Sequence, residues 1–162
     1  MDLEPDVLKK RMTHFKDRLR RSGVKLTHQR LEIFREVAKS QDHPDAETVY
    51  KGVRRRVPTV SLDTVYRTLW LLVDLGLLTT LGPQRERVRF DANMSSHHHF
   101  VCMKCGMACD FYCKEFDQLK IPDALKTLGG VEKTHVEVRG ICLRCLKKTN
   151  PRHCAWRKKE EK

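Results

Sequence analysis

Two cysteine pairs restrict this chain more than any other feature of its sequence. Cys102 and Cys105 are separated by two residues, and so are Cys142 and Cys145. Each CxxC turn directs two thiolates toward one point, and two such turns supply the four sulfur ligands that tetrahedral zinc prefers, at about 2.3 Å. Because four thiolates leave no open position on the metal, the sequence predicts a structural Zn(II) site that ties the two pairs together.

The remaining three cysteines of the seven leave other pairings open. The run CMKCGMACDFYC places Cys109 and Cys113 close to the first pair, and Cys154 has no evident partner. The CxxC geometry favours the two pairs as ligands, so we expect Cys109 and Cys113 to be core or surface thiols. Reduced thiols are the rule in the cytoplasm, where such pairs indicate metal binding sooner than disulfides.

The N-terminus carries no apolar signal-peptide core. No stretch of the chain approaches the roughly 18 apolar residues that a membrane helix needs. We therefore expect a cytoplasmic protein that makes no membrane contact.

A second metal site is predicted by nitrogen and oxygen donors. His97, His98 and His99 follow Asp91 and precede Asp110, and imidazoles with carboxylates suit an exchangeable iron, manganese or zinc ion. On a strand His97 and His99 face one side and His98 the other, so two imidazoles can share one metal. His43 is a candidate ligand from the N-terminal half, and a metal that joins the halves would fix their angle.

Apolar residues at helical spacing, with capping and stop signals, predict four helices in the N-terminal half, at residues 3–21, 27–40, 45–57 and 61–76. Thr27 and Ser61 are expected N-caps. Two strand-like runs, 77–81 and 88–91, follow around a Gly-Pro turn that carries Arg85 and Arg87. This order is typical of a winged helix-turn-helix, in which the last helix enters the major groove and the hairpin touches phosphates.

The sequence pattern of the C-terminal part differs from that of the N-terminal half. Strand-like runs at 100–102 and 131–141 enclose a helical stretch near 114–128. The predicted fold class is therefore α+β, with a winged helix-turn-helix domain followed by a small α/β module that holds the four-cysteine zinc site. The expected domains are residues 1–92, residues 93–147 and a basic tail, 148–162.

The charge distribution agrees with a polyanionic partner. The net charge is +12; residues 1–92 hold 19 basic and 13 acidic side chains, residues 93–143 hold 6 of each, and residues 144–162 hold 8 and 2. The excess lies on the N-terminal half and the tail, so nucleic acid is the first candidate. In the run Arg54-Arg55-Arg56 we expect phosphate contacts or solvated surface.

From about residue 20 to 147 the chain resembles the ferric uptake regulator family. The resemblance rests on GVKLTHQRLEIFREV, HPDAETVYKGV, SLDTVYRTLWLLVDLGLL, VRFD, HHHFVCMKCG and GICLRC in that order. It implies a homodimer that binds inverted-repeat operator DNA when its sensing metal is present, with the C-terminal module as the dimerisation domain. Two departures are that THQR lacks the proline common after the threonine, and that the triple histidine lacks an acidic residue.

The resemblance also assigns the sites. It maps the structural zinc onto the two CxxC pairs and the exchangeable Fe(II) or Mn(II) site onto five residues, His43, Asp91, His97, His99 and Asp110. Iron sensors of the family usually carry glutamate where this chain has its two aspartates, and peroxide sensors carry aspartate. The chain thus resembles the peroxide-sensing branch, in which iron reacts with peroxide and oxygen is added to a ligand histidine, here His43 or His97. A looser match maps a third site onto His98, Asp117 and His135.

The same resemblance makes Ser61, Thr64, Tyr66 and Arg67 the DNA-facing positions. A tyrosine ring packs on a thymine methyl and an arginine reaches guanine or phosphate. An iron-sensing regulator is the alternative function, and a metal store or chaperone is a more distant one that would need no recognition helix. A zinc enzyme would need an open metal position and a general base, and the chain carries no HExxH motif.

Overall fold

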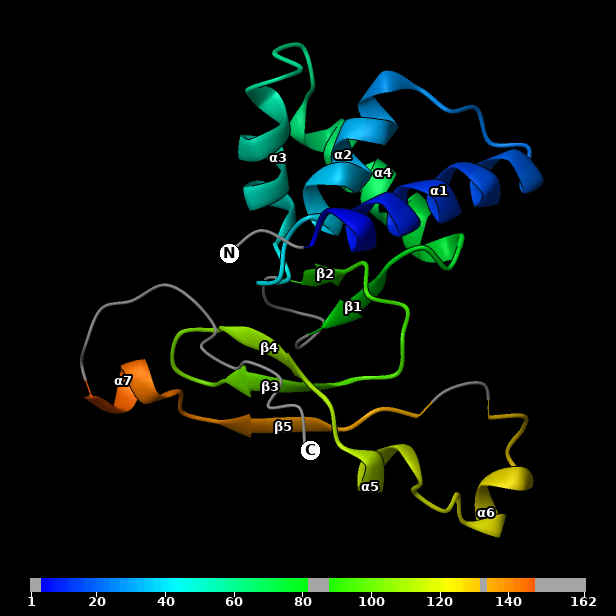
Figure 1. The fold of residues 1–162 in the computed structure, drawn as a ribbon, viewed down its shortest axis with the longest axis vertical. Coiled ribbons are helices and arrows are strands. Elements are labelled where there is room, and N and C mark those ends of the chain that lie inside the picture. Colours follow the sequence, from blue (N-terminus) through cyan, green and yellow to red (C-terminus); the bar gives the residue numbers. More distant parts are fainter. Residues whose placement is uncertain (1–3, 82–87, 132–133, 148–162) are drawn as a thin grey trace. The chain divides into compact units, whose positions relative to one another are not determined.

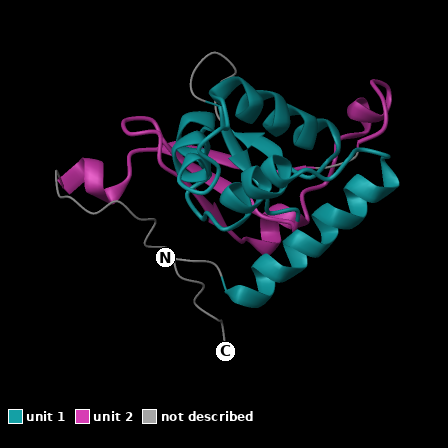
Figure 2. Cartoon of the chain, turned by 90° about the horizontal axis from the view of Figure 1, so that it is seen from above, with its two compact units in different colours: residues 1–94 teal, residues 95–162 magenta. Residues whose placement is uncertain are grey.

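The computed structural model describes residues 4–81, 88–131 and 134–147. Contacts within the chain divide it into two compact units, residues 1–94 and 95–162, coloured separately in Figure 2. Among the described residues, no helix is long and apolar enough to cross a lipid bilayer.

The described residues of unit 1 form four helices and a two-stranded sheet (Figure 1). Its elements are α1 (Pro5–Arg21), α2 (His28–Ala38), α3 (Ala46–Arg54), α4 (Leu62–Asp74), β1 (Thr79–Leu81) and β2 (Arg89–Asp91). The strands pair antiparallel, with Thr80 opposite Phe90. The three helices α2, α3 and α4 followed by a hairpin give the winged helix-turn-helix that the sequence predicts. The turn of that hairpin, with Arg85 and Arg87, lies outside the described residues.

Three helices of unit 1 begin at a side-chain cap. Thr27, Asp45 and Ser61 each accept a hydrogen bond from the backbone N–H three residues further on. Such a bond satisfies one of the donors that a helix start leaves without a partner inside the helix, and it is worth about 1 kcal/mol. The caps predicted at Thr27 and Ser61 are confirmed. Gly76 ends α4 with φ +66°, a backbone conformation that glycine adopts without strain.

One apolar core joins all four helices of unit 1 to its sheet. Phe15 of α1 stacks on Phe34 of α2 with ring centroids 4.4 Å apart, and both rings are buried. Leu69 and Leu72 of α4 are fully buried against the same cluster. Each such side chain contributes about 1.5–3 kcal/mol on burial, so the core fixes the position of α4.

Unit 2 is built on a three-stranded sheet in the order β4-β3-β5. Its elements are β3 (His98–Cys102), β4 (Ala108–Phe111), α5 (Lys114–Asp117), α6 (Asp123–Lys126), β5 (Glu137–Gly140) and α7 (Leu143–Lys147). β3 pairs antiparallel with β4 and parallel with β5. The sheet and helices together confirm the predicted α+β class.

Two details of unit 2 correct the sequence-based expectations. The helix expected near 114–128 is wrong as a single element, because two short helices, α5 and α6, flank Pro122. A proline has no N–H to donate, and it disfavours helical backbone at the residue before it, here Ile121. Among the described residues of 131–141, the strand is restricted to β5, since only Glu137–Gly140 of them pairs with β3.

Candidate metal centres

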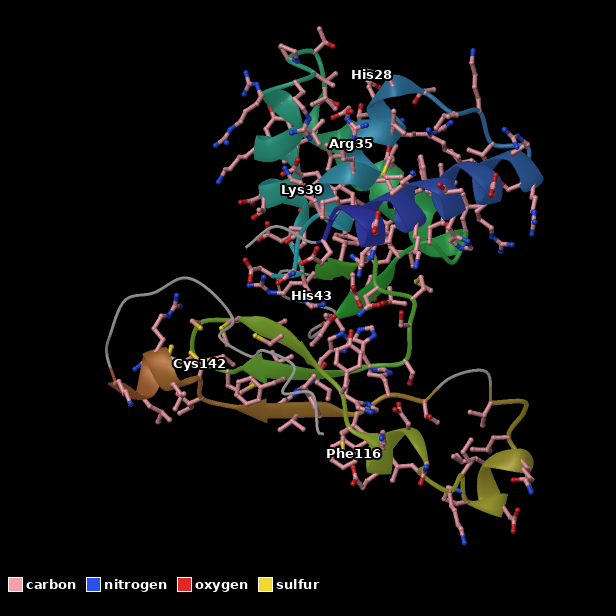
Figure 3. All side chains as sticks on the ribbon, viewed as in Figure 1. His28, Arg35, Lys39, His43, Phe116 and Cys142 are labelled. Carbon is pink, nitrogen blue, oxygen red and sulfur yellow. The ribbon has the colours of Figure 1, made fainter. Side chains whose placement is uncertain are left out.

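The sheet of unit 2 brings the two CxxC pairs together. β5 runs parallel to β3 with Cys102 opposite Gly140, so Cys142 follows at the same end of the sheet. The backbone N–H of Met103 donates to the carbonyl of Gly140 at 2.8 Å, which holds the two chain segments side by side. Figure 3 shows sulfur atoms gathered beside Cys142 at this end of unit 2.

The four thiols have the arrangement of a tetrahedral zinc site. One sulfur from each of Cys102, Cys105, Cys142 and Cys145 lies within 4.8 Å of the others. Cys105 Sγ and Cys142 Sγ are 3.7 Å apart. Four sulfurs at about 2.3 Å from one zinc ion stand about 3.8 Å from each other, so the cluster fits that ion and leaves no open position.

Hydrogen bonds favour a thiolate at Cys102. Burial of this side chain opposes ionisation, but the backbone N–H groups of Cys142, Cys105 and Lys104 outweigh it and lower the pKa of Cys102 to about 6. Burial and thiol hydrogen bonds raise the pKa of Cys145 to about 12. Zinc binds thiolates, so hydrogen bonds that favour the Cys102 thiolate also favour the bound metal.

Two other cysteines of unit 2 lie outside this cluster. Cys113 is a free thiol that donates to Glu115 Oε2 at 3.1 Å, as expected for a thiol near the surface. Cys109 is buried and disulfide-bonded, so the expectation of a free thiol there is wrong. Neither residue belongs to the four-sulfur group.

A second set of ligand atoms converges in unit 2. His97 Nε2 and His99 Nε2 lie 2.8 Å apart, which confirms that these two imidazoles face the same side. Asp110 stands opposite His99 in the β3–β4 register, and its Oδ1 is 3.5 Å from His99 Nε2 and 3.8 Å from His97 Nε2. Both imidazoles are 3% exposed, so bulk water does not form hydrogen bonds with their ring nitrogens there.

The tautomer of His97 suits metal binding. Its Nδ1 lies 2.7 Å from the carbonyl oxygen of Ser95, which can only accept a hydrogen bond. The proton of neutral His97 is therefore on Nδ1, and the lone pair of Nε2 points toward His99 and Asp110. A hydrogen bond of this kind on the outer nitrogen is the usual support of a metal-ligating histidine. No sequence motif indicates Ser95, since it contributes a backbone atom.

Unit 1 contributes a second pair of candidate ligands. His43 Nε2 is 3.6 Å from Asp91 Oδ1, and these side chains are 3% and 4% exposed. Phe90 N donates to the Pro44 carbonyl and Arg89 Nη1 donates to the His43 carbonyl, so β2 holds the segment that carries His43. His43 adopts φ +47°, a left-handed conformation uncommon outside glycine. The surrounding hydrogen bonds maintain this strained conformation, and such strain is concentrated at functional sites.

The predicted third set is arranged differently. His98 Nδ1 accepts a hydrogen bond from the Val136 N–H at 3.2 Å, so its proton is on Nε2. That nitrogen lies 3.3 Å from the Cys113 carbonyl and 3.4 Å from Asp117 Oδ1. His135 is exposed. Both nitrogens of His98 thus serve hydrogen bonds, and a third metal site stays a prediction.

The N-terminal half of α4 presents the predicted DNA-facing residues. Ser61 caps the helix, Thr64 is half-buried, and Tyr66 and Arg67 are exposed. Arg67 forms an ion pair with Asp63 at 2.7 Å, with both side chains more than 70% exposed. Such a surface pair contributes little to stability and releases its arginine readily.

In the run Arg54-Arg55-Arg56 all three side chains are exposed, as expected for solvated surface, but Arg56 also pairs with two glutamates of α2. Its guanidinium binds Glu32 at 2.5 Å and Glu36 at 2.6 Å. Glu32 is only 3% exposed and also pairs with Arg35. Arg56 therefore holds the turn before α4 against α2. In the sequence, a glutamate among the apolar positions of α2 could have indicated an arginine partner.

The fold and its sites together define a metal-dependent transcription regulator. The fold is a winged helix-turn-helix, and the sites are a four-thiolate cluster and sets of buried imidazoles and carboxylates. The cysteine cluster fits structural zinc, and the histidine and aspartate sets fit a regulatory metal. The chain belongs to the ferric uptake regulator family, whose model matches residues 21–139. Members of this family are transcription regulators and not enzymes.

Relatives agree with this membership, and a solved structure has a similar fold. The chain is 32% identical over 132 residues to the peroxide-responsive repressor PerR of Staphylococcus epidermidis, covering 82% of this chain and 88% of that one. It is 33% identical over 132 residues to the peroxide operon regulator of Bacillus subtilis, covering 82% and 91%. The fold is similar to that of the ferric uptake regulator Fur of Helicobacter pylori, with a TM-score of 0.70, 21% identity, and coverage of 90% and 97%.

Proposed function

We propose that this chain is a cytoplasmic repressor that binds inverted-repeat operator DNA as a homodimer and senses peroxide through Fe(II), with Mn(II) as an unreactive substitute. The convergence of buried imidazoles and carboxylates in each unit is the observation that carries the proposal. Membership of the family and similarity to peroxide-responsive repressors support it. The four-cysteine zinc then has a structural role in unit 2, separate from sensing.

The regulatory ion is bound by both ligand sets in this proposal. His97, His99 and Asp110 contribute from unit 2, and His43 and Asp91 contribute from unit 1. Imidazole and carboxylate donors suit iron and manganese, whereas the thiolates of the other cluster suit zinc. A shared ion couples the two units, and losing one ligand uncouples them, which is the two-state behaviour that regulation requires.

Ferrous iron, when bound, supplies the reaction with peroxide that adds oxygen to a ligand imidazole. The residues of this chain hold the two candidate imidazoles in place. Ser95 orients His97 through its carbonyl, and the Arg89 and Phe90 hydrogen bonds hold the segment of His43. An oxidised imidazole is a weaker ligand, so either His43 or His97 suffices to weaken the site and release the DNA.

Operator recognition is assigned to α4 in this proposal. Tyr66 and Arg67 supply base contacts in the major groove, and Ser61 and Thr64 supply contacts at the start of the helix. The core beneath Leu69 and Leu72 supports this role, because it orients α4 rigidly. Arg85 and Arg87 of the predicted wing are proposed phosphate contacts and lie outside the described residues.

The proposal is tested by mass spectrometry of the intact protein and its peptides. Zinc-loaded protein is reconstituted with Fe(II) without oxygen and then given a brief, low dose of peroxide. We expect one oxygen atom, about 16 mass units, to be added to the peptide that holds His43 or His97. The matched control is the same protein loaded with Mn(II), which should remain unmodified.

Other outcomes assign the protein to the alternative functions. Operator binding that needs iron, without oxidation of either peptide, would make the protein an iron-sensing regulator. Metal binding with no retention of any DNA would make it a metal store or chaperone. Operator binding is measured with DNA selected by the protein from a random pool, since the selection itself identifies the operator sequence and shows whether it is palindromic.

A further inference from the structure

Helix α1 makes a hydrogen bond to the C-terminal end of α4, the proposed recognition helix. Arg18 Nε donates to the carbonyl of Leu75 at 2.9 Å, across 57 positions of the sequence. α4 ends at Asp74, and Leu75 is its C-cap. Carbonyls at the end of a helix have no partner inside it, so the following backbone or a side chain must satisfy them. Arg18 therefore satisfies one of these carbonyls from another helix.

The charges at this end of α4 add to the effect of the bond. α4 has no basic residue in its last turn, and its final residue, Asp74, is an exposed acid. Partial negative charge accumulates at the C-terminal end of a helix, so a cation there is stabilising and an anion is not. The guanidinium of Arg18 supplies the cation that α4 itself lacks.

A second arginine of α1 forms a bond of the same kind. Arg11 Nη1 donates at 2.9 Å to the carbonyl of Ala38, the last residue of α2. Arg11, Phe15 and Arg18 follow one another at intervals of four and three residues, so they lie on one face of α1. Between the two arginines, Phe15 stacks on Phe34 of α2. α1 thus contacts the C-terminal ends of two helices of the winged helix-turn-helix.

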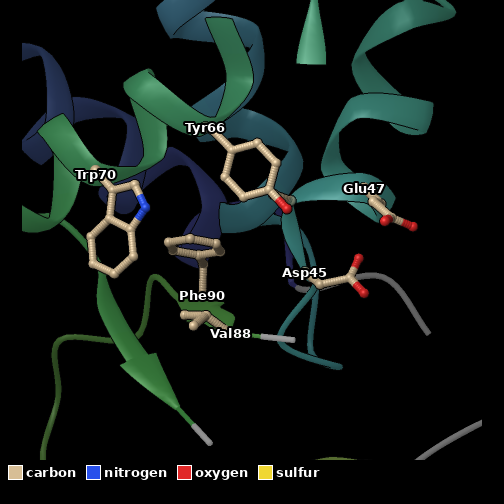
Figure 4. Close-up of a pocket in the computed structure, with 7 residues that line it drawn as sticks. Asp45, Glu47, Tyr66, Trp70, Val88 and Phe90 are labelled. Atoms are coloured by element: carbon tan, nitrogen blue, oxygen red, sulfur yellow. The ribbon is translucent and has the colours of Figure 1, made fainter. Parts of the chain in front are cut away.

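Packing around α4 is complete on its core side and incomplete beside β2. A cavity of about 120 Å³ lies between the start of α3, α4 and β2, and its lining includes Asp45, Tyr66 and Trp70 (Figure 4). Trp70 packs edge-on against Phe90 of β2, with ring centroids 5.9 Å apart, but it remains 45% exposed. Burial of apolar surface is non-directional, whereas a hydrogen bond restrains both distance and angle. The bond from Arg18 therefore adds a directional restraint at the end of α4.

We infer that Arg18 is a positioning residue for DNA recognition, an inference that rests on the proposed function of α4. Arg67 lies roughly 12 Å from Leu75 along the helix at about 1.5 Å per residue, so a small change of helix direction at Leu75 displaces its side chain. Base contacts depend on the placement of the side chain, whereas phosphate contacts carry no sequence information. Arg18 precedes residues 21–139, the part of the chain that the family model matches, so membership of the family assigns it no role.

Hydrogen exchange of the free protein tests the contact itself. The full-length, zinc-loaded protein is compared with its Arg18→Met variant, which keeps an unbranched side chain and loses the donor. We expect the backbone amides of residues 75–77, which bond to carbonyls inside α4, to exchange about two- to fivefold faster, as the loss of a cation at a helix C-terminus predicts. Arg20→Met is the matched control, because Arg20 pairs with Asp17 of α1 itself, at 3.7 Å. It should leave these amides unchanged.

DNA binding tests the consequence for recognition. The operator is the sequence that the wild-type protein selects from a random pool. Arg18→Met should lower the affinity for operator DNA about threefold more than the affinity for random DNA. Arg18→Lys, which keeps a cationic donor, should recover most of this loss. Arg20→Met removes the same charge from α1 and should lower both affinities equally.

The outcomes separate this inference from the proposed function. Unchanged exchange in Arg18→Met would overturn the inference even if operator affinity fell, because Arg18 would then act on the DNA directly. Equal effects of Arg18→Met and Arg20→Met, or faster exchange without any loss of operator preference, would overturn it as well. A wild-type protein that selects no operator would contradict the proposed function instead, and the exchange experiment needs no DNA. Circular dichroism checks that each variant is folded.

Discussion

Cys105 Sγ lies 3.7 Å from Cys142 Sγ, although 37 positions separate the two residues in the sequence. The parallel pairing of β3 with β5 creates this proximity. Among the described residues of unit 2, the buried hydrophobic side chains are few: Cys102, Ala108, Cys109 and Cys142. A module with so small an apolar core depends on another source of stability, and the four-thiolate zinc site supplies it.

Replacing one zinc ligand should therefore unfold unit 2. We expect Cys105→Ser to lower the zinc content from about one ion per chain to near zero and to abolish the thermal transition of unit 2, because structural zinc contributes on the order of 10 kcal/mol. Metal analysis and circular dichroism during heating measure both effects. Cys113→Ser is the matched control: this thiol bonds only Glu115 among the contacts described, so its loss should cost less than about 1 kcal/mol. Equal effects of the two substitutions would remove the zinc assignment.

Asp110→Asn should separate the two metal centres. The neutral amide lacks the charge that Asp110 presents to His97 and His99. We expect affinity for Mn(II) to fall by a factor of about 10–100 while the zinc content is unchanged. Competition with a fluorescent chelator measures the affinity under anaerobic conditions. Unchanged Mn(II) affinity would exclude Asp110 as a ligand.

Arg67→Ala and Arg55→Ala should weaken DNA binding in different ways. Arg67 lies on the exposed face of α4 and has only the weak surface pair with Asp63 to lose. We expect its removal to cost about 1–3 kcal/mol with operator DNA and much less with random DNA. Arg55 is exposed beyond α3, and its removal should lower both affinities and reduce the salt dependence. Fluorescence anisotropy at several salt concentrations distinguishes these roles, and a uniform loss in both variants would contradict the division.

Arg56→Ala should lower stability rather than affect DNA contact first. It leaves the 3%-exposed Glu32 with Arg35 alone and removes the bond to Glu36. We expect the free energy of unfolding to fall by about 1–3 kcal/mol, less than for a fully buried pair because Arg56 is partly exposed. Urea unfolding measures this change, with Arg55→Ala as the neutral control. A similar loss in Arg55→Ala would show that the bond to Glu32 is not the cause.

His135→Ala should leave the number of bound metal ions unchanged. Both nitrogens of His98, the histidine at the centre of the predicted third site, serve hydrogen bonds with Val136 and Cys113, and Nε2 also lies 3.4 Å from Asp117 Oδ1. Metal analysis after dialysis against zinc compares wild type with the variant. A loss of one ion per chain would establish the third site and imply that His98 changes partners when metal binds.

Much of unit 1 could be predicted because its signals are local. The caps at Thr27 and Ser61 and the stop at Gly76 depend on residues within one turn of each helix, and all are observed. The shared side of His97 and His99 follows from strand alternation alone. Local rules also mark Pro122 as a helix breaker, although a helical stretch near 114–128 was expected across it.

Donor type and spacing are properties of the chain, so the amino-acid sequence was enough to specify the chemistry of both kinds of metal site: thiolates from two CxxC pairs, and nitrogen and oxygen from histidines with aspartates. Which distant groups meet depends instead on the folded molecule. The partners of Arg56, the carbonyl of Ser95 behind His97, and the cavity between Trp70 and Asp45 all result from packing between separate elements. No local pattern encodes such contacts, because they depend on how the core places helices and strands.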